Sequence, residues 1–493
     1  MLLYTFLGWL DIKSCLLFLS VCLLLADILL NRNPKNFPPG PWPLPLLGNV
    51  FTGVDYKAID KLAAEYGSVF SLRWGREKMV FVSGYKRVKE ALVDQGEIFA
   101  DRPITPLFHK VFKGLGLGLS SGYLWKKQRR FAVTHLKHFG EGKKTLESFI
   151  QQECGFVCEA IREEHGHPFN PHFTLNNAVA NIICSLVFGH RFDYNDENFQ
   201  RILRLTARTF NLIASTRAQL YNAFPGVLKY LPGPHQTIFS NYAKVTGFIR
   251  EEIEKHKADW DPSDPRDFID AYFGEIGNRK DDTEAGFNME NLVICCLDFF
   301  EAGTETTSTT LRWGLLYMIK YPEIQKKVQG EIDSVIGQGR QPSMDDRASM
   351  PYTDAVIHEI MRIGNIVPLN LAHMTNKDTT LGGYFLPKGT TVITNFTSVL
   401  CDKKEWETAE TFNPRHFLDS NGKFFKRESF IPFSAGRRVC LGEQLARMEL
   451  FLFFTSLLQR FSFSPPPGEE PKLEIQEGVI LCPQPFQICA SPR

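Results

Sequence analysis

The chain has 493 residues and a formal net charge of +1, which argues against a nucleic-acid binder that depends on bulk positive charge. Its 11 cysteines are an odd number, and the sequence contains no CxxC pair or Cys/His cluster. These features argue against a disulfide framework and a structural zinc site, and they favour free thiols in a reducing compartment.

The N-terminus predicts a membrane anchor. Residues 14–30 are mostly apolar, with Asp27 as the only charge, and the run is about as long as the ~17–25 residues that span a bilayer. No small-x-small cleavage site follows, so an anchor over residues 1–30 is favoured over a cleaved signal peptide. Arg32 and Lys35 come next, and the positive-inside tendency then puts the rest of the chain in the cytoplasm.

The remainder predicts a hinge and one large domain. Residues 31–49 are rich in proline and predict a semi-rigid hinge. Over residues 50–493, long amphipathic patterns predict helices, and short strand-like runs occur near both ends. We therefore expect a mainly α fold with small β-sheets built from distant segments. The glycine-rich residues 114–122 do not match GxGxxG, so they are interpreted as a mobile loop rather than a phosphate-binding one.

One cysteine lies in an unusual setting. Cys440 follows Arg437 and Arg438 and precedes a segment, from Gly442 onward, whose pattern predicts a helix. A helix N-terminus and nearby cations lower the pKa of a thiol, and Gly436 and Gly442 give a flat partner room to approach. The pattern favours a thiolate ligand of haem iron. A nucleophile would need a nearby His, and a buried structural cysteine is the other alternative.

Residues 295–313 predict a helix with a chemically distinctive middle. Ala302 and Gly303 leave a small-residue gap, and Glu305 and Thr306 follow. A Thr hydroxyl can donate to the i−4 carbonyl and open the helix, and an acid beside a hydroxyl suits proton delivery to a small ligand such as O2. A polar patch on an ordinary helix is the alternative.

Two further helices carry paired polar residues. Glu359 and Arg362 are an i,i+3 pair, which would act as a structural lock if buried and would contribute little if exposed. Trp125 and Arg129 are i,i+4 neighbours that could both donate to a carboxylate such as a haem propionate. A basic surface helix is the other interpretation of the second pair.

Together these segments resemble a cytochrome P-450, a haem-thiolate monooxygenase. The family's cysteine signature is met by Phe433, Gly436, Arg438, Cys440 and Gly442. Its helix motif is met by Ala302, Gly303, Glu305, Thr306 and Thr307, its Glu-x-x-Arg motif by Glu359 and Arg362, and its Trp-x-x-x-Arg motif by Trp125 and Arg129. In the Pro-Glu-Arg-Phe segment, His416 stands where Arg is usual, as the third partner of the Glu359–Arg362 pair.

The resemblance is strongest to the second microsomal family and its J-type members. It implies a haem b cofactor with Cys440 as axial thiolate ligand, and propionate contacts from Arg102, Trp125, Arg129, His373 and Arg438. It implies proton transfer by Thr306 and Glu305. The implied substrate pocket is lined by Leu119, Phe299, Ala302, Val367, Leu371 and Leu481.

The implied activity is insertion of one oxygen atom from O2 into lipophilic substrates, as in epoxidation and hydroxylation of arachidonic and related fatty acids. The sequence holds no flavin or nicotinamide motif, so the expected partners are NADPH–cytochrome P-450 reductase and cytochrome b5. We expect docking on Lys126, Lys127, Arg130, Arg437 and Arg447. The implied location is the endoplasmic reticulum membrane, with the catalytic domain on its cytoplasmic face. The alternatives are a xenobiotic or steroid hydroxylase, a reductase-independent haem-thiolate isomerase and a non-catalytic haem sensor.

Overall fold

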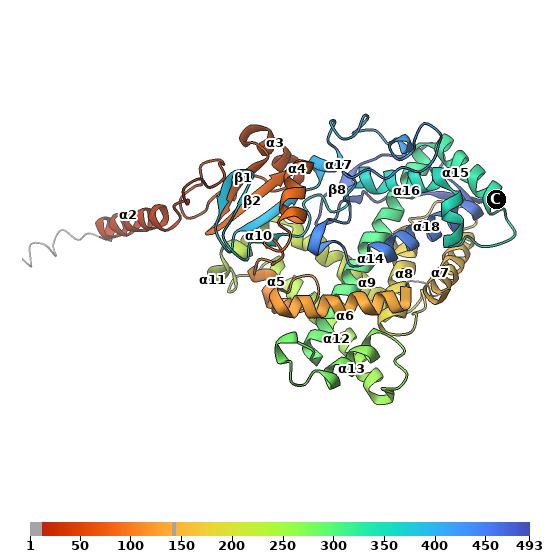
Figure 1. Cartoon of the computed structure of the whole chain (residues 1–493), viewed down its shortest axis with the longest axis horizontal. Coiled ribbons are helices and arrows are strands. Elements are labelled where there is room, and N and C mark those ends of the chain that lie inside the picture. The colour runs from red at the N-terminus through yellow and green to blue at the C-terminus, as the bar shows by residue number, and fades with distance from the viewer. Residues whose placement is uncertain (1–11, 141–143) are drawn as a thin grey trace, which may run out of the picture.

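The computed structural model describes residues 12–140 and 144–493 and is mainly helical (Figure 1). The α-helices are α2 (Ile12–Leu30), α3 (Tyr56–Tyr66), α4 (Tyr85–Lys89), α5 (Pro106–Phe112), α6 (Gly122–Gly140), α7 (Lys144–Glu163), α8 (His172–Val187), α9 (Glu197–Ala214), α10 (Thr216–Ala223), α11 (Pro225–Leu228), α12 (Pro234–Asp259), α13 (Phe268–Asn278), α14 (Met289–Lys320), α15 (Pro322–Val335), α16 (Pro351–Gly364), α17 (Thr397–Leu400) and α18 (Glu443–Arg460). A short π-helix, η1 (Glu90–Asp94), and the 3₁₀ turns η2 (Thr283–Ala285), η3 (Met344–Ser349), η4 (Pro414–Phe417) and η5 (Gly436–Arg438) lie between them.

The strands are short and form small sheets. They are β1 (Val69–Trp74), β2 (Glu77–Ser83), β3 (His373–Met374), β4 (Thr379–Leu381), β5 (Tyr384–Leu386), β6 (Thr391–Asn395), β7 (Phe461–Ser464), β8 (Ile475–Gln476), β9 (Cys482–Pro483) and β10 (Cys489–Pro492). The largest sheet has the order β1-β2-β6-β3, in which β2 and β6 are parallel. The prediction of a mainly α fold with small sheets from distant segments is therefore confirmed.

Helix α14 crosses the middle of the body (Figure 1). The side chain of Asn288 caps its N-terminus by accepting from the backbone N–H of Asn291, and most of the 32 residues are buried. Its neighbours include α8, α12 and α18. At Gly303 a Cβ would lie 2.4 Å from the side chain of Ile183, so this glycine lets α8 approach α14 closely.

Helix α2 extends from one end of the body, and its C-terminal end is attached to the large sheet (Figure 1). Asp27 and Arg73 form a buried ion pair at 3.0 Å, and the backbone N–H of Leu46 donates to the same carboxylate. The proline-rich segment lies along β1, where the N–H of Ser71 donates to the carbonyl of Pro39. The hinge is thus packed against the catalytic body.

The predicted anchor, residues 1–30, is described only in part. Residues 14–30 belong to α2, whereas residues 1–11 lie outside the described residues. Across residues 12–140 and 144–493, no helix has both the length and the apolar character that crossing a membrane requires.

Candidate functional site

Cys440 lies in a tightly packed loop between η5 and α18. Its backbone N–H donates to the carbonyl of Phe433 at 2.8 Å. Gly436 has φ 71°, and a Cβ there would lie 1.7 Å from the carbonyl oxygen of Leu92, so only glycine fits. Cys440 is exposed although this loop is held firmly, which leaves its thiol open to a ligand.

The protein raises the pKa of the Cys440 thiol. Desolvation by the surrounding protein atoms is the largest cause, even though the residue is exposed. The backbone N–H of Gly442 and the positive charge of Arg129 lower the pKa, but by less. The helix start lowers this pKa as predicted, through the N–H of Gly442, but desolvation outweighs that contribution and the pKa of the thiol alone is raised. A coordinating metal deprotonates a thiol outright, so Cys440 becomes a thiolate together with its metal.

The middle of α14 directs its acid and its hydroxyl to different faces. Ala302 is exposed, and the hydroxyl of Thr306 donates to its carbonyl at 2.6 Å, as predicted. Glu305 is buried and faces α8, where its Oε1 lies 3.8 Å from Nε2 of His172. Burial raises the pKa of Glu305 and lowers that of His172 to about 4. Glu305 therefore keeps its proton to a higher pH than an exposed carboxyl does.

Two predicted propionate contacts lie beside the buried ring of Trp125. The guanidinium carbon of Arg438 lies 3.7 Å from the ring centroid, and that of Arg129 lies 5.9 Å away. Arg102 and Arg438 donate to backbone carbonyls of neighbouring segments. The indole Nε1 of Trp125 is buried without a hydrogen-bond partner in the described chain. The structure thus brings four of the predicted cofactor contacts into one region.

This arginine group, Arg102, Arg129 and Arg438, has no ion-paired counter-charge in the described part of the chain, although the charge of Asp101 acts on Arg438. Among the described residues, no carboxylate lies within ion-pair distance of any of the three. Burial lowers the pKa of Arg438 to about 8 and that of Arg102 to about 10, and repulsion between the arginines adds to both shifts. Because a guanidinium keeps its proton in proteins, the group favours a bound anion. The carboxylates of a haem fit this requirement and also offer an acceptor to Trp125.

His373, the fifth predicted propionate contact, already has partners for both ring nitrogens. Its Nδ1 lies 2.7 Å from the carbonyl oxygen of Phe99, and its Nε2 lies 3.3 Å from the amide nitrogen of Asn370. Burial, with repulsion from Arg102, lowers the pKa of His373 well below its usual value. The imidazole is therefore neutral, and it can donate to a propionate only by giving up one of these bonds.

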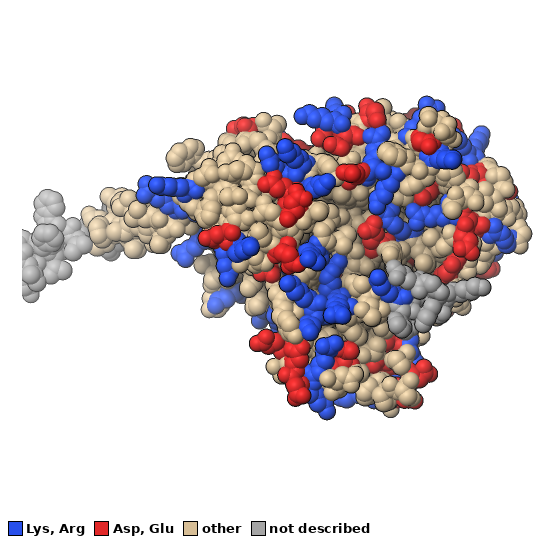
Figure 2. Space-filling model, viewed as in Figure 1, with Lys and Arg blue, Asp and Glu red and all other residues tan. Residues whose placement is uncertain are grey.

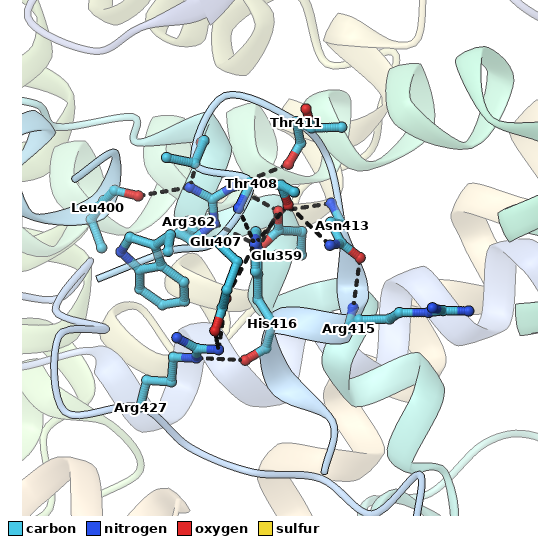
Figure 3. Close-up of polar contacts among 12 residues, drawn as sticks. Glu359, Arg362, Leu400, Glu407, Thr408, Thr411, Asn413, Arg415, His416 and Arg427 are labelled. Carbon is cyan, nitrogen blue, oxygen red and sulfur yellow. Dashed lines mark hydrogen bonds and ion pairs between the residues drawn. The ribbon is translucent and has the colours of Figure 1, made fainter. Parts of the chain in front are cut away.

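The Glu359–Arg362 pair is a buried lock (Figure 3). Arg362 donates twice to the carboxylate of Glu359, at 2.7 Å in each case, and its other N–H groups donate to the carbonyls of Leu400, Ala409 and Thr411. Nδ1 of His416 lies 3.2 Å from both carboxylate oxygens. The predictions of a buried lock and of His416 as its third partner are confirmed.

The hydrogen bonds of the lock also assign the tautomer of His416. The backbone N–H of Thr408 donates to Nε2, so Nε2 is an acceptor and Nδ1 carries the proton given to Glu359. The backbone N–H of Asn413 supplies a further donor to Glu359. This lock joins α16 to η4 and so fixes the segment that precedes the Cys440 loop.

The predicted substrate residues differ in exposure. Ala302 and Leu371 are exposed, Leu119 and Val367 are half-buried, and Phe299 and Leu481 are buried. The ring of Phe299 packs on Phe268 at a centroid distance of 4.9 Å, and the N–H of Leu481 donates to the carbonyl of Ile366. Their role in substrate binding stays a prediction.

Two acids on α14 were missed by the sequence analysis, although both interrupt an apolar run. Asp298 accepts from the backbone N–H groups of Leu117 and Gly118, so it ties the predicted glycine-rich loop to α14. Glu301 is buried and accepts from the hydroxyl of Tyr242 at 3.3 Å. Burial raises the pKa of Asp298 to about 6 and that of Glu301 to about 8, and the nearby charge of Asp298 adds to the second shift.

The basic residues expected to dock a reductase are not equivalent. Arg437 and Lys126 are exposed and both pair with Glu97. Arg447 is mostly buried, where it pairs with Glu443 and donates to His358. Including Arg447 in the docking set was therefore wrong, because its charge is already used inside the protein.

An open thiol near a region of arginines without an anion defines the class of protein: it is a haem-thiolate protein. The model of the family described as Cytochrome P450 matches residues 38–490, and the chain belongs to this family. It is 53% identical to human cytochrome P450 2J2 over 485 residues, which cover 98% of this chain and 96% of that protein. It is 52% identical to mouse cytochrome P450 2J5 over 492 residues, 99% of this chain and 98% of that protein.

Rat cytochrome P450 2J3 is also 52% identical, over 488 residues that cover 98% of this chain and 97% of that protein. These identities place the chain in the J-type branch. It is a cytochrome P450 monooxygenase whose cofactor is haem with a cysteine thiolate ligand.

Proposed function

We propose that this protein is a microsomal monooxygenase that epoxidises or hydroxylates polyunsaturated fatty acids such as arachidonic acid. The observation that carries the proposal is the 52–53% identity to J-type members over nearly the whole chain. Oxidation of xenobiotics or steroids by the same chemistry is the alternative. A reductase-independent isomerase is disfavoured by the retained Glu305 and Thr306.

Haem bound by the Cys440 thiolate would supply O2 activation, since a thiolate ligand favours O–O cleavage. The chain supplies position and protons. The arginine group and Trp125 would hold the propionates, and Thr306, on the same face as the exposed Ala302, would donate a proton to the bound ligand. Glu305, whose pKa is raised by burial, would resupply that proton from the α8 side.

The acids on α14 bear on how a fatty acid would lie. Asp298 is only half-buried, and its pKa of about 6 leaves it mostly ionised at neutral pH. A substrate carboxylate beside it would be repelled. We therefore propose that the hydrocarbon part lies along α14 near Phe299 and Ala302, and that the carboxylate points away from Asp298. The other proposed lining residues, Leu119, Val367, Leu371 and Leu481, are all apolar.

Electrons would come from NADPH–cytochrome P-450 reductase, with cytochrome b5 as a second partner. The proposed docking residues are now Lys126, Lys127, Arg130 and Arg437. In a reconstituted system, Lys126→Gln with Arg130→Gln should reduce reductase-supported turnover and its salt dependence. Arg447→Gln is not a matched control because Arg447 is buried, so Arg415→Gln at an exposed position takes that place. If the double variant and Arg415→Gln had the same turnover and the same salt dependence, reductase docking on this surface would be contradicted.

We propose attachment to the endoplasmic reticulum membrane through α2, with the body on the cytoplasmic side. The side chains of α2 from Leu16 to Leu30 are largely exposed and apolar. Val227, in α11, and Tyr230, just after it, are exposed apolar side chains on a second segment. Such surfaces favour contact with lipid.

The deciding experiment is product analysis with reconstituted reductase on a panel of fatty acids, steroids and drug-like amines. Oxygenated fatty acids formed only with NADPH would support the proposal, whereas turnover of steroids or amines alone would favour the alternative. Conversion of a fatty-acid hydroperoxide without NADPH would identify an isomerase. In the reduced carbon monoxide difference spectrum, Cys440→His should lose the long-wavelength band of a thiolate-ligated haem.

A further inference from the structure

A groove with a volume of about 490 Å³ lies where α2 joins the body. The segment after α2, the turn between β1 and β2, and the start of β6 form its walls. The residues that hold the haem and those proposed to line the substrate pocket are not among its lining residues. This size is within the range of ligand sites in proteins, roughly 300–1,000 Å³.

Four cations line the groove: Arg32, Arg76, Lys78 and Lys388. Glu77 also lines it, and its carboxylate accepts from the hydroxyl of Thr391 at 2.7 Å. Within the described part of the chain, none of the four cations lies within ion-pair distance of a carboxylate. The groove therefore has an excess of positive charge that the protein leaves unpaired.

Lys78 is the most buried of these cations and joins two walls of the groove. Its Nζ donates to the carbonyl of Arg32 at 2.8 Å and lies 5.8 Å from the ring centroid of Phe37. Burial, with repulsion from Arg73, lowers the pKa of Lys78. An anion in the groove would favour the charged form of Lys78 and so offset the cost of its burial.

The groove adjoins the surface that we propose contacts the membrane. Leu30, the last residue of α2, is 79% exposed, and Arg32 follows two residues later. Ile104, which lines the groove, is 72% exposed. Figure 2 shows Lys and Arg side chains at the junction of α2 with the body. A ligand with an anionic head and an apolar tail would match this combination.

We propose that the groove binds the phosphate-bearing headgroup of an anionic phospholipid; this inference rests on the membrane attachment proposed above. The cations would contact the phosphate and the carboxylate of such a headgroup, and Ile104 and α2 would contact the acyl region. A basic residue near an anionic membrane surface contributes about 1 kcal/mol to binding. The lipid would thereby help to fix the orientation of the body on the membrane.

The test uses the full-length, haem-loaded protein and sedimentation with phosphatidylcholine vesicles that contain or lack phosphatidylserine. For the wild type, phosphatidylserine should tighten binding. In Arg76→Gln with Lys388→Gln this gain should fall by about 5- to 25-fold, from about 1 kcal/mol per cation. Arg415→Gln with Lys423→Gln makes the same charge change at exposed positions outside the groove and should keep the gain.

A photoactivatable phosphatidylserine should crosslink to the groove walls in the wild type and lose those crosslinks in the groove variant. Binding to phosphatidylcholine vesicles without any gain from phosphatidylserine would overturn the groove proposal and leave the attachment intact. Failure to bind either vesicle would overturn both. Loss of the crosslinks on adding inorganic phosphate at constant ionic strength would identify a free-phosphate site and overturn the lipid assignment.

Discussion

The arginine of the lock and the three arginines of the arginine group differ in where their counter-charge comes from. In the lock, Arg362 is fully buried and its carboxylate partner, Glu359, lies one helical turn away on α16. In the arginine group, Arg102, Arg129 and Arg438 have backbone carbonyls around them but no carboxylate among the described residues. The lock is therefore complete within the chain, and the arginine group requires an anionic cofactor.

The difference separates folding from cofactor binding. A buried charge without a partner costs several kcal/mol, and a well-formed pair offsets most of that cost. The lock meets this cost during folding, so it should form without haem. In the haem-free protein, the desolvation of the arginine group lowers the free energy of unfolding. The propionates would offset this cost when haem binds, and the affinity for haem would be higher for that reason.

The largest expected effect is at the lock. Arg362→Met leaves Glu359 buried without its cation, and this should lower the free energy of unfolding by about 3–5 kcal/mol. Urea denaturation followed by circular dichroism measures the change, in haem-free and haem-loaded protein alike. The control is Arg415→Met on the adjoining η4, which is exposed and should change stability by less than about 0.5 kcal/mol. Equal stability of Arg362→Met and wild type would show that the Glu359–Arg362 pair does not stabilise the folded protein.

Substitution in the arginine group should lower the affinity for haem much more than the stability of the haem-free protein. Arg438→Met removes a buried cation that has no ion-paired carboxylate in the described part of the chain, so haem-free stability should fall much less than in Arg362→Met or should rise. Haem affinity should fall by about 10- to 100-fold, the value of one lost hydrogen bond to a charged group. Haem transfer to a competing apo-globin measures it. Arg437→Met, at the exposed neighbouring position, is the control and should retain haem normally.

His256 is another buried cation, and like Arg362 it has an internal acid. Its Nε2 lies 2.8 Å from a carboxylate oxygen of Asp267, and its Nδ1 lies 2.8 Å from the carbonyl of Glu252. Burial alone would lower the pKa of His256, but these bonds raise it to about 9.

Because the folded pKa of His256 exceeds the usual 6.5, its contribution is complete below pH 6.5 and is lost as the pH rises to about 9. The stability difference between wild type and His256→Asn should therefore shrink over this window, by about 3 kcal/mol. Denaturation curves at several pH values measure it. A difference that does not depend on pH would mean that the imidazole is neutral in the folded protein.

The smallest expected effect is at His416. Since this residue donates one neutral hydrogen bond to Glu359, His416→Gln, which keeps an N–H donor, should cost about 1 kcal/mol or less, and His416→Leu about 1.5–3 kcal/mol. The two urea midpoints give the comparison. Equal losses in both variants would show that ring packing, such as the contact of His416 with Trp406, matters more than the donated proton.

Sequence reasoning identified the family because its motif residues occur at fixed local spacings. The back-bond of Thr306 to Ala302 and the i,i+3 pair of Glu359 with Arg362 follow from helix geometry. The propionate contacts were expected from the resemblance, and the structure brings Arg102, Trp125, Arg129 and Arg438 together from segments far apart in the chain. Their detailed roles toward haem and substrate stay predictions.

Burial and long-range pairing could not be read from the sequence. The desolvation that raises the pKa of Cys440 depends on how closely other segments surround the thiol. The pairing of Arg447 with Glu443, and the loss of its charge from the surface, likewise depends on the packing of α18. The hydrogen bonds of Asp298 and Glu301 form because the loop before α6 and helix α12 lie beside α14, and the sequence does not show that proximity.

By itself, then, the sequence determined the family, the thiolate ligand and the helices that carry the motifs, because these depend on local spacing and on residue chemistry. Tertiary structure alone decided which charges are paired. Within residues 12–140 and 144–493, it gave Arg362 a complete set of partners and left the arginine group and the groove cations without an ion-paired carboxylate. Desolvation and ion-pair energies depend on distances between segments that are remote in the chain, so only the folded chain sets them.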